Sequence, residues 1–375
     1  MSKERKAKAA GKPEGFSAKE RALLQRVAKP LLSWYGREAR DLPWRKDPKP
    51  YHIWLSEIIF QQTRIEAGTA YYLRFLKEVP TVQALAELPE EKLLKLWEGL
   101  GYYNRARNLQ KAAKLVMTDY EGNLPGTAAE LEKLPGIGSY TAGAIASIAF
   151  GQAVPAVDGN VLRVLSRVLA RYDDIALQET KKNMELELAP AVPKEAPGDF
   201  NQALMDLGAT VCIPNGEPRC EACPLKDLCL ARAGGLTAEL PIKGAAKARR
   251  VEERKLLLCC ADEDGKKRWF LRKREEKGLL AGLWEIPAAK AGFEPSGALA
   301  GGQCTELPES KHVFSHVEWR MSCLQLKFAE QPSCEALEAL GIAAEEGRCV
   351  WATAEEIETL YSLPSAFKAY KKYLK

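Results

Sequence analysis

The sequence predicts a mainly α-helical N-terminal region followed by a smaller α+β region. From about residue 18 to residue 230, apolar residues recur at the spacing of amphipathic helices. Beyond Cys229, short β-prone runs alternate with short helical ones, which is typical of an α+β domain. The length of 375 residues suits two domains, and a hydrophobic content of 46% allows each to bury a core. No apolar run approaches the roughly 18 residues of a membrane span.

Short segments with proline or glycine divide the helical region, such as Asn123–Gly126 and Gly151–Pro155. The helical spacing is clearest in Leu23–Trp34, Trp54–Phe60, Leu93–Leu100, Ala128–Leu134 and Thr141–Phe150. We expect this domain to cover residues 18–235. Residues 1–17 are expected to form a disordered basic tail, because no apolar segment follows the basic residues as it would in a secretion signal.

The α+β domain is expected over residues 251–375, after a linker over residues 236–250 that ends in a basic stretch. Its strands are predicted at Lys255–Cys260, Arg268–Arg272, Met321–Phe328 and Cys349–Ala352, and its helices at Glu335–Gly341 and Ala354–Leu360. The net charge of +5 is too small to establish a nucleic-acid partner, and isolated basic stretches usually mark a solvated surface.

Four of the ten cysteines fall close together, with the spacing C-x7-C-x2-C-x5-C. They are Cys212, Cys220, Cys223 and Cys229. In a chain without an export signal, a metal site is favoured over a disulfide framework. Four thiolates at this spacing enclose either a zinc ion or a 4Fe–4S cluster, and spacing alone does not choose between them. The basic residues around them can rest on phosphates: Arg219, Lys226 and Arg232.

The segment Leu134–Gly138 lies between two helical runs and contains two glycines. Glycines permit a tight turn with exposed backbone amides, and amides at a helix N-terminus form an anion site that suits a DNA phosphate. A simple connection between two helices explains the same segment equally well.

Two carboxylates have surroundings that suit acid–base chemistry. Asp158 precedes an apolar-periodic run, so it is placed to cap a helix, and a helix N-terminus favours an ionised carboxylate. Glu57 lies among Leu55, Ile58 and Ile59, where desolvation would raise its pKa towards that of a general acid. A purely structural cap and a solvated helix face are the simpler explanations. Together, however, one raised acid and one ionised partner form the pair that breaks glycosidic bonds.

Several ordered motifs resemble the adenine DNA glycosylase (MutY) family of the helix-hairpin-helix superfamily, which includes endonuclease III. They are Asp41–Arg45, Trp54–Thr63, Gly99–Tyr103, the hairpin with Asp158, Phe200–Gly208, the four-cysteine loop and Phe314–His316. The resemblance implies a six-helix barrel with an iron–sulfur cluster domain, followed by a Nudix-like domain. It also implies a monomer in the bacterial cytoplasm, associated with the nucleoid, that binds double-stranded DNA containing adenine opposite 8-oxoguanine or guanine. Membrane association is not expected.

The resemblance assigns roles by position. The adenine rotates out of the stack into a pocket, where Glu57 protonates its N7 and Asp158 stabilises the oxocarbenium-like sugar, assisted by Tyr140 and Asn160. Residues that would contact DNA or the extruded adenine are Trp44, Arg45, Phe60, Gln62, Thr63, Ile65, Tyr102, Gly136, Gly138, Gln202, Ser315 and His316. Among these, Gln62 and Tyr102 would enter the duplex. The four cysteines would hold one 4Fe–4S cluster.

One hairpin position separates members of the superfamily. Bifunctional relatives carry a lysine there, whose amine attacks the sugar so that the strand is then cut, whereas this chain has Tyr140. The resemblance therefore implies base removal with little or no lyase activity. An endonuclease III-like glycosylase/lyase and a lesion-binding protein without chemistry are the alternatives. Tyr140 and the C-terminal domain argue against the first, and the presence of both carboxylates argues against the second.

The C-terminal domain resembles the Nudix-related domain of this family through Gly278–Pro287. It lacks the glutamate-rich helix of a Nudix hydrolase, so the resemblance implies that Ser315 and His316 read 8-oxoguanine instead. The chain departs from the family pattern twice. The first gap of the cysteine motif has seven residues where six are usual, and Phe60 stands where a smaller aliphatic residue is usual.

Overall fold

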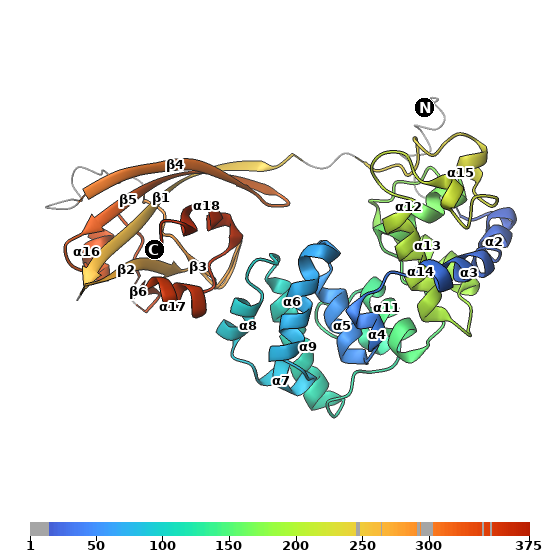
Figure 1. The fold of residues 1–375 in the computed structure, drawn as a ribbon, viewed down its shortest axis with the longest axis horizontal. Coiled ribbons are helices and arrows are strands. Elements are labelled where there is room, and N and C mark those ends of the chain that lie inside the picture. The colour runs from blue at the N-terminus through green and yellow to red at the C-terminus, as the bar shows by residue number, and fades with distance from the viewer. Residues whose placement is uncertain are drawn as a thin grey trace. The chain divides into compact units, whose positions relative to one another are not determined.

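The computed structural model describes residues 15–244, 248–263, 265–290, 293, 303–339, 341–345 and 347–375 (Figure 1). Residues 1–14 of the expected basic tail and residues 245–247 of the expected linker lie outside the described residues. Within the described ranges, no helix combines the length and the apolar character needed to cross a membrane.

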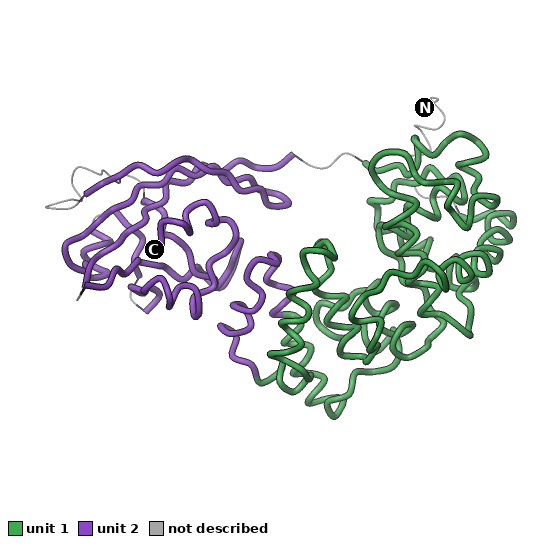
Figure 2. Tube along the Cα trace, in the orientation of Figure 1, with its two compact units in different colours: residues 1–87, 108–245 green, residues 88–107, 246–375 purple. Residues whose placement is uncertain are grey.

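The chain forms two compact units (Figure 2). Unit 1 comprises residues 1–87 and 108–245, and unit 2 comprises residues 88–107 and 246–375. The domain boundaries expected from the sequence remain a proposal. The units differ from them in residues 88–107, which group with the C-terminal part of the chain rather than with the helices around them in sequence.

Unit 1 is built from helices. Those before the hairpin are α2 (Ala18–Leu24), α3 (Ala28–Glu38), α4 (Pro43–Lys46), α5 (Pro50–Ile59), α6 (Ile65–Glu78), α7 (Val82–Glu87) and α9 (Asn104–Asp119), whose first turn belongs to unit 2. From the hairpin onward they are α10 (Ala128–Leu131), α11 (Ser139–Phe150), α12 (Gly159–Val168), α13 (Gln178–Leu188), η1 (Ala189–Ala191), α14 (Pro197–Thr210), η2 (Cys220–Ala222) and α15 (Leu230–Ala233).

The core of unit 1 fixes the start of α12. Leu165 of α12, Leu204 of α14 and Leu31 of α3 belong to one buried cluster, and each is fully buried. Burying a leucine stabilises the fold by about 1.5–3 kcal/mol, so this cluster holds α12 and α14 firmly together. The N-terminus of α12, where Asp158 lies, is thereby held against α14.

Unit 2 contains a mixed sheet of six strands in the order β3-β2-β1-β5-β4, with β6 paired to β2. The strands are β1 (Arg250–Glu263), β2 (Lys266–Lys273), β3 (Trp284–Glu285), β4 (Gln303–Val313), β5 (Val317–Phe328) and β6 (Cys349–Ala352). The pair β1–β5 is parallel and the other pairs are antiparallel. The helices of this unit are α8 (Glu90–Leu96), α16 (Cys334–Ala339), α17 (Ala354–Thr359), η3 (Ser365–Phe367) and α18 (Lys368–Lys371).

Both faces of the sheet are buried at the second half of β1. On β1, Leu256 and Leu258 belong to one apolar cluster, whereas Leu257 and Cys259 belong to another on the opposite face. This alternation follows from the period of two along a strand. It explains why the sequence shows a continuous apolar run at this point rather than alternating apolar and polar residues.

Candidate active site

Glu57 lies near the C-terminal end of α5, between buried Leu55, Ile58 and Ile59, and is itself partly buried. The Tyr140 hydroxyl donates a hydrogen bond to Glu57 Oε2 at 2.6 Å. Burial raises the pKa of Glu57 to about 7, the Tyr140 hydrogen bond opposes this rise, and the charge of Asp158 adds to it. The sequence predicted this direction correctly. A carboxyl group with such a pKa is poised to donate a proton near neutral pH.

Tyr140 reaches Glu57 from the first turn of α11, directly after the hairpin. Burial raises the pKa of Tyr140 well above its usual range, so the phenol stays protonated and acts as the donor. Its oxygen also lies 3.6 Å from Met205 Sδ. The first turn of α11 therefore places a neutral hydrogen-bond donor against Glu57.

The hairpin connects α10 with α11 and depends on Gly136. Its φ is +80°, and a Cβ there would lie 2.7 Å from Asn108 Cβ, so any other residue would be strained and would also clash. Gly138 precedes α11 as its N-cap, is exposed, and would have no atom within 4 Å of an added Cβ. The N-terminus of α11 is thus open to an anion.

Asp158 caps α12, as the sequence predicted. Its Oδ1 accepts a hydrogen bond from the Val161 N–H at 2.8 Å, and its Oδ2 accepts one from Asn160 Nδ2 at 2.7 Å. Burial nevertheless raises the pKa of Asp158 above its usual value, because desolvation outweighs these two bonds. The sequence predicted an ionised carboxylate from the helix terminus alone, whereas burial, which no local pattern shows, acts in the opposite direction.

A chain of hydrogen bonds connects Asp158 to the cysteine loop. Arg163 Nη2 donates to Asn160 Oδ1 at 2.8 Å, and Arg163 Nε donates to the Cys212 carbonyl at 2.8 Å. A Cβ on Gly208 would lie 2.6 Å from Asn160 Cβ, so only glycine allows α14 to approach Asn160 this closely. The cysteine loop and the Asp158 carboxylate are therefore connected through two side chains, Asn160 and Arg163.

Two buried polar residues of α14 support the site and were not among the site residues predicted from the sequence. Asn201 is fully buried and accepts a hydrogen bond from the Ala156 N–H at 2.9 Å, which fixes the segment that leads to Asp158. Asp206 is also fully buried and receives Arg45 Nη1 at 2.7 Å and Nη2 at 2.8 Å, together with Arg40. Their only signal in the sequence was a polar residue at an apolar position of a helix.

Arg45 is held in place by Asp206. Burial lowers the pKa of Arg45, but the hydrogen bonds and charge of Asp206 raise it overall, and the charge of Glu57 adds to this rise. Its Nε–H is buried and has no hydrogen-bond partner among the described residues. A buried donor without a partner is costly, so this group is available to a ligand.

Phe60 stacks on buried Trp44 with 4.4 Å between ring centroids. Its ring occupies space that a side chain at Gly68 would take, since a Cβ there would lie 2.6 Å from Phe60 Cε1. Gly68 on α6 therefore accommodates the unusual bulk of Phe60. The remaining candidates near this cluster in sequence are Thr63 in the turn before α6, Ile65 at the first position of α6 and Gln202, buried on α14.

Gln62 and Tyr102 both have left-handed backbone conformations, with φ of 57° and 47°. Both are exposed; 49% of Tyr102 is accessible. Residues other than glycine rarely adopt such a φ, and where they do the strain often marks a functional turn. Gln62 lies in unit 1, whereas Tyr102 lies in unit 2, between α8 and α9.

Ser315 and His316 form the exposed turn between β4 and β5. Ser315 Oγ lies 3.2 Å from His316 Nδ1, and the Phe314 N–H donates to the Val317 carbonyl at 2.8 Å to close the turn. Phe314 anchors it by packing edge-on against buried Trp319, with centroids 4.9 Å apart. The two polar side chains are thus presented to solvent on an anchored loop.

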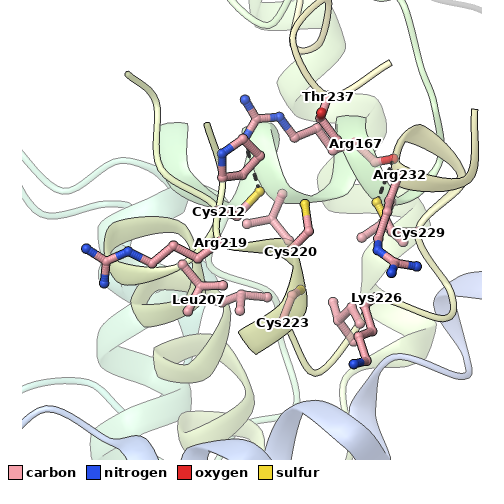
Figure 3. A pocket seen from close by; sticks show the side chains of 15 residues that line it. Arg167, Leu207, Cys212, Arg219, Cys220, Cys223, Lys226, Cys229, Arg232 and Thr237 are labelled. Carbon is pink, nitrogen blue, oxygen red and sulfur yellow. Dashed lines mark hydrogen bonds between the residues drawn. The ribbon is translucent and has the colours of Figure 1, made fainter. Parts of the chain in front are cut away.

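The four cysteines line one cavity of unit 1 (Figure 3): Cys212, Cys220, Cys223 and Cys229. Burial raises the pKa of Cys223 to about 12, and the other three thiols add to this rise. Arg167 Nη1 lies 3.2 Å from Cys212 Sγ and so places a cation at this sulfur. This donor set of four thiols beside an arginine fits an anionic iron–sulfur centre. In the ranges that the structure describes, no three His, Cys, Asp or Glu side chains converge closely enough to hold a metal ion, and this includes the four cysteines. The assignment of a cluster therefore rests on the cavity that the four thiols share and on their chemistry.

The basic residues of the sequence motif also lie around this cavity (Figure 3). Arg232 pairs with Glu221 at 2.9 Å, and Lys226 lies 3.6 Å from the same carboxylate. Arg219 lines the cavity as well.

Comparisons with known proteins agree with both units. Residues 55–194 match the HhH-GPD superfamily of base excision DNA repair proteins, and residues 258–373 match the NUDIX domain. The fold of the helical part is similar to that in a solved complex of endonuclease III with DNA, with 26% identity and a TM-score of 0.50 over 58% of this chain and 98% of that one.

Two mammalian relatives are similar over most of the chain. The adenine DNA glycosylase of Homo sapiens is 36% identical over 77% of this chain, which spans 64% of the human protein. That of Mus musculus is 36% identical over 82% of this chain and 71% of the mouse protein. The chain therefore belongs to the adenine DNA glycosylase family, with an HhH-GPD helical domain and a Nudix-like C-terminal domain.

Proposed function

We propose that this protein hydrolyses the N-glycosidic bond of adenine opposite 8-oxoguanine or guanine in duplex DNA. The observation that carries the proposal is the Glu57–Tyr140 hydrogen bond, 2.6 Å long, in a site where Asp158 acts on the acidity of Glu57. The names of the relatives, which are adenine DNA glycosylases, support the choice of base. The enzyme is proposed to act as a monomer on DNA in the bacterial cytoplasm.

In the proposed reaction, the protonated Glu57 carboxyl transfers its proton to N7 of the extruded adenine. The bond between the base and C1′ breaks, and the electron pair leaves with the base. Asp158 stabilises the positive charge that develops on the sugar, and Asn160 holds the Asp158 carboxylate through its amide. Water then adds to C1′ and loses its proton to the Glu57 carboxylate, which yields free adenine and an abasic site.

Tyr140 supplies no amine, so no covalent intermediate forms at the sugar through this position and little strand cleavage is expected. The likeness to endonuclease III favours a glycosylase/lyase on oxidised pyrimidines as the second candidate. Incubation with duplex DNA containing thymine glycol separates the two, because strand cuts would favour the second candidate.

DNA contacts are proposed for the residues that present strained or exposed positions. Gln62 and Tyr102 enter the duplex, the amides after Gly136 and Gly138 hold a phosphate, and Ser315 and His316 contact 8-oxoguanine. The adenine pocket is proposed to include Trp44, Arg45, Phe60, Thr63, Ile65 and Gln202.

The four cysteines are proposed to hold one 4Fe–4S cluster that fixes the loop between α14 and α15. Purified protein should contain about four iron atoms per chain and show a visible absorbance band. Colourless protein with stoichiometric zinc would refute this assignment.

The decisive experiment is Glu57→Gln, assayed on duplexes with adenine opposite 8-oxoguanine, guanine or cytosine. The variant should bind the first duplex normally and release adenine at least on the order of 10²-fold more slowly, because the proton donor is gone. Near-normal release would show that Glu57 has another role.

A further inference from the structure

A groove of about 600 Å³ lies in unit 2, beside the edge strand β4 and the helix α18. We call it the basic groove. Its lining includes Lys311 and His312 of β4, Lys368 of α18 and Lys372 directly after it, with Glu309 as the one carboxylate in this lining. Three lysines against one carboxylate give the groove an excess of positive charge.

The lysines of the basic groove are exposed, and among the described residues no ion pair involves Lys311, Lys368 or Lys372. The contrast with Lys371 is informative. That residue lies on the same helix but pairs with Glu98. Three ammonium groups therefore lie in one concave site, and none of them forms an ion pair among the described residues. This arrangement favours the binding of an anion from outside the protein.

The basic groove is continuous with the turn that carries Ser315 and His316. The His312 ring, which lines the groove, packs edge-on against Phe314 with centroids 4.6 Å apart, and Phe314 packs in turn on Trp319. Burial lowers the pKa of His312, so its ring is neutral at neutral pH and the lysines supply the charge. A DNA strand that contacts the turn through one base would place a neighbouring backbone phosphate near these lysines.

We propose that the basic groove binds a backbone phosphate of the DNA strand that carries 8-oxoguanine. This rests on the proposed function, because it assumes that the turn contacts that strand. Lysine ammonium groups attract phosphates as point charges, and phosphate contacts set the register of a protein on DNA without reading its sequence. The groove would thus hold the strand while the turn reads the base.

The test compares Lys368→Ala/Lys372→Ala with the matched control Lys266→Ala/Lys267→Ala. The control removes the same charge from exposed positions at the start of β2, away from the groove lining. Each full-length protein is titrated by fluorescence anisotropy at several KCl concentrations. The ligand is a duplex with a tetrahydrofuran abasic analogue opposite 8-oxoguanine, so binding does not depend on catalysis by Glu57.

The groove variant should show a salt dependence of log K that is shallower by about 1, since the one lost phosphate contact removes about 0.9 from the slope. Relative to the wild type, the variant should lose affinity by a similar factor for the duplex with 8-oxoguanine and for the duplex with guanine, because phosphates carry no base information. The control should keep a slope near that of the wild type. Thermal melting of each variant checks that the fold is intact.

A groove variant whose slope equals that of the control would overturn the proposal. A loss confined to the 8-oxoguanine duplex would also overturn it, because the groove would then read the base. Adenine release by the wild type is measured separately. Failure of that assay would count against the proposed function, whereas the salt slopes would still decide whether the groove binds DNA.

Discussion

Glu57 owes its acidity to its immediate neighbours. Its pKa of about 7 results from burial, moderated by the Tyr140 hydrogen bond. If Glu57 is the proton donor, single-turnover release of adenine should fall about tenfold per pH unit above roughly pH 7, as the carboxyl loses its proton. Tyr140→Phe removes a contact that lowers this pKa, so the midpoint should move to higher pH. A pH–rate profile of both proteins measures this, and an unchanged midpoint in the variant would contradict it.

The raised pKa of Glu57 also predicts how the free energy of unfolding depends on pH. Because the folded-state pKa of Glu57 is raised from 4.5 to about 7, the folded protein binds more protons than the unfolded chain between these values. Stability is therefore lost as pH rises through this window. Glu57→Gln escapes the loss, so its free energy of unfolding relative to the wild type should be higher at pH 8 than at pH 5, by on the order of 2–3 kcal/mol. Urea unfolding at both pH values checks the sign.

Phe60 and Gly68 form a complementary pair. Gly68→Ala would gain up to about 1 kcal/mol in helix propensity, but the new Cβ would meet the Phe60 ring at 2.6 Å. Overpacking typically costs about 1–3 kcal/mol, so we expect net destabilisation. Phe60→Leu in the Gly68→Ala background should recover most of the loss, which a double-mutant cycle in urea would measure. Equal losses in both backgrounds would show that the two residues do not interact.

Among elements, the segment of residues 88–107 is fastened to the C-terminal sheet unit through α8. Lys95 Nζ donates to Glu98 Oε2 at 2.7 Å, the Ile357 carbonyl at 3.0 Å and the Tyr361 carbonyl at 3.1 Å. Ser362 Oγ adds a bond to the Leu94 carbonyl at 3.0 Å. These contacts join the end of α17 to the helix that precedes Tyr102.

Lys95→Met should therefore loosen this segment. The change removes the Lys95 donor from two carbonyls and from Glu98, which keeps its ion pair with Lys371, and the two unsatisfied carbonyls cost about 1–3 kcal/mol. We expect faster amide hydrogen exchange in residues 88–107 and weaker DNA binding, because the turn that carries Tyr102 would be held less firmly. Lys92→Met on the exposed face of α8 is the matched control. Exchange rates equal to those of the control would contradict the role of Lys95.

The sequence predicted elements well where one physical signal dominated. The helices that carry Glu57 and follow Asp158 were found because their apolar spacing is regular, and β1 was found from its apolar run. β4 was missed because it is an edge strand with a largely exposed polar surface, and its register shifts between Leu307 and Ser310 around a proline. The attachment of residues 88–107 to unit 2 depends on contacts with residues more than 200 positions away, which no local pattern encodes.

For the whole molecule, the proposed functions divide between the two units. Glu57, Tyr140 and Asp158 lie in unit 1, whereas Tyr102 and the turn with Ser315 lie in unit 2. The sequence already assigned the proposed base removal and the proposed reading of the opposing base to two domains by resemblance, but no local pattern showed that residues 88–107, with Tyr102, belong to the C-terminal unit. It also could not show the raised pKa of Asp158, which arises from burial by distant parts of the chain.

This division predicts that chemistry and opposing-base preference are altered independently. Ser315→Ala/His316→Ala should lower the ratio of adenine release opposite 8-oxoguanine to release opposite guanine, and leave the saturated rate opposite guanine unchanged. Tyr140→Phe should change the rate on both duplexes by one common factor, because the hydroxyl contacts only Glu57 and Met205 of unit 1 among the described hydrogen-bond partners. Residues without shared partners have nearly additive effects, so the triple variant should show the product of both changes. Single-turnover rates for all four proteins on both duplexes test this. If Tyr140→Phe changed the preference for 8-oxoguanine over guanine, recognition of the opposing base would be coupled directly to the proton donor Glu57.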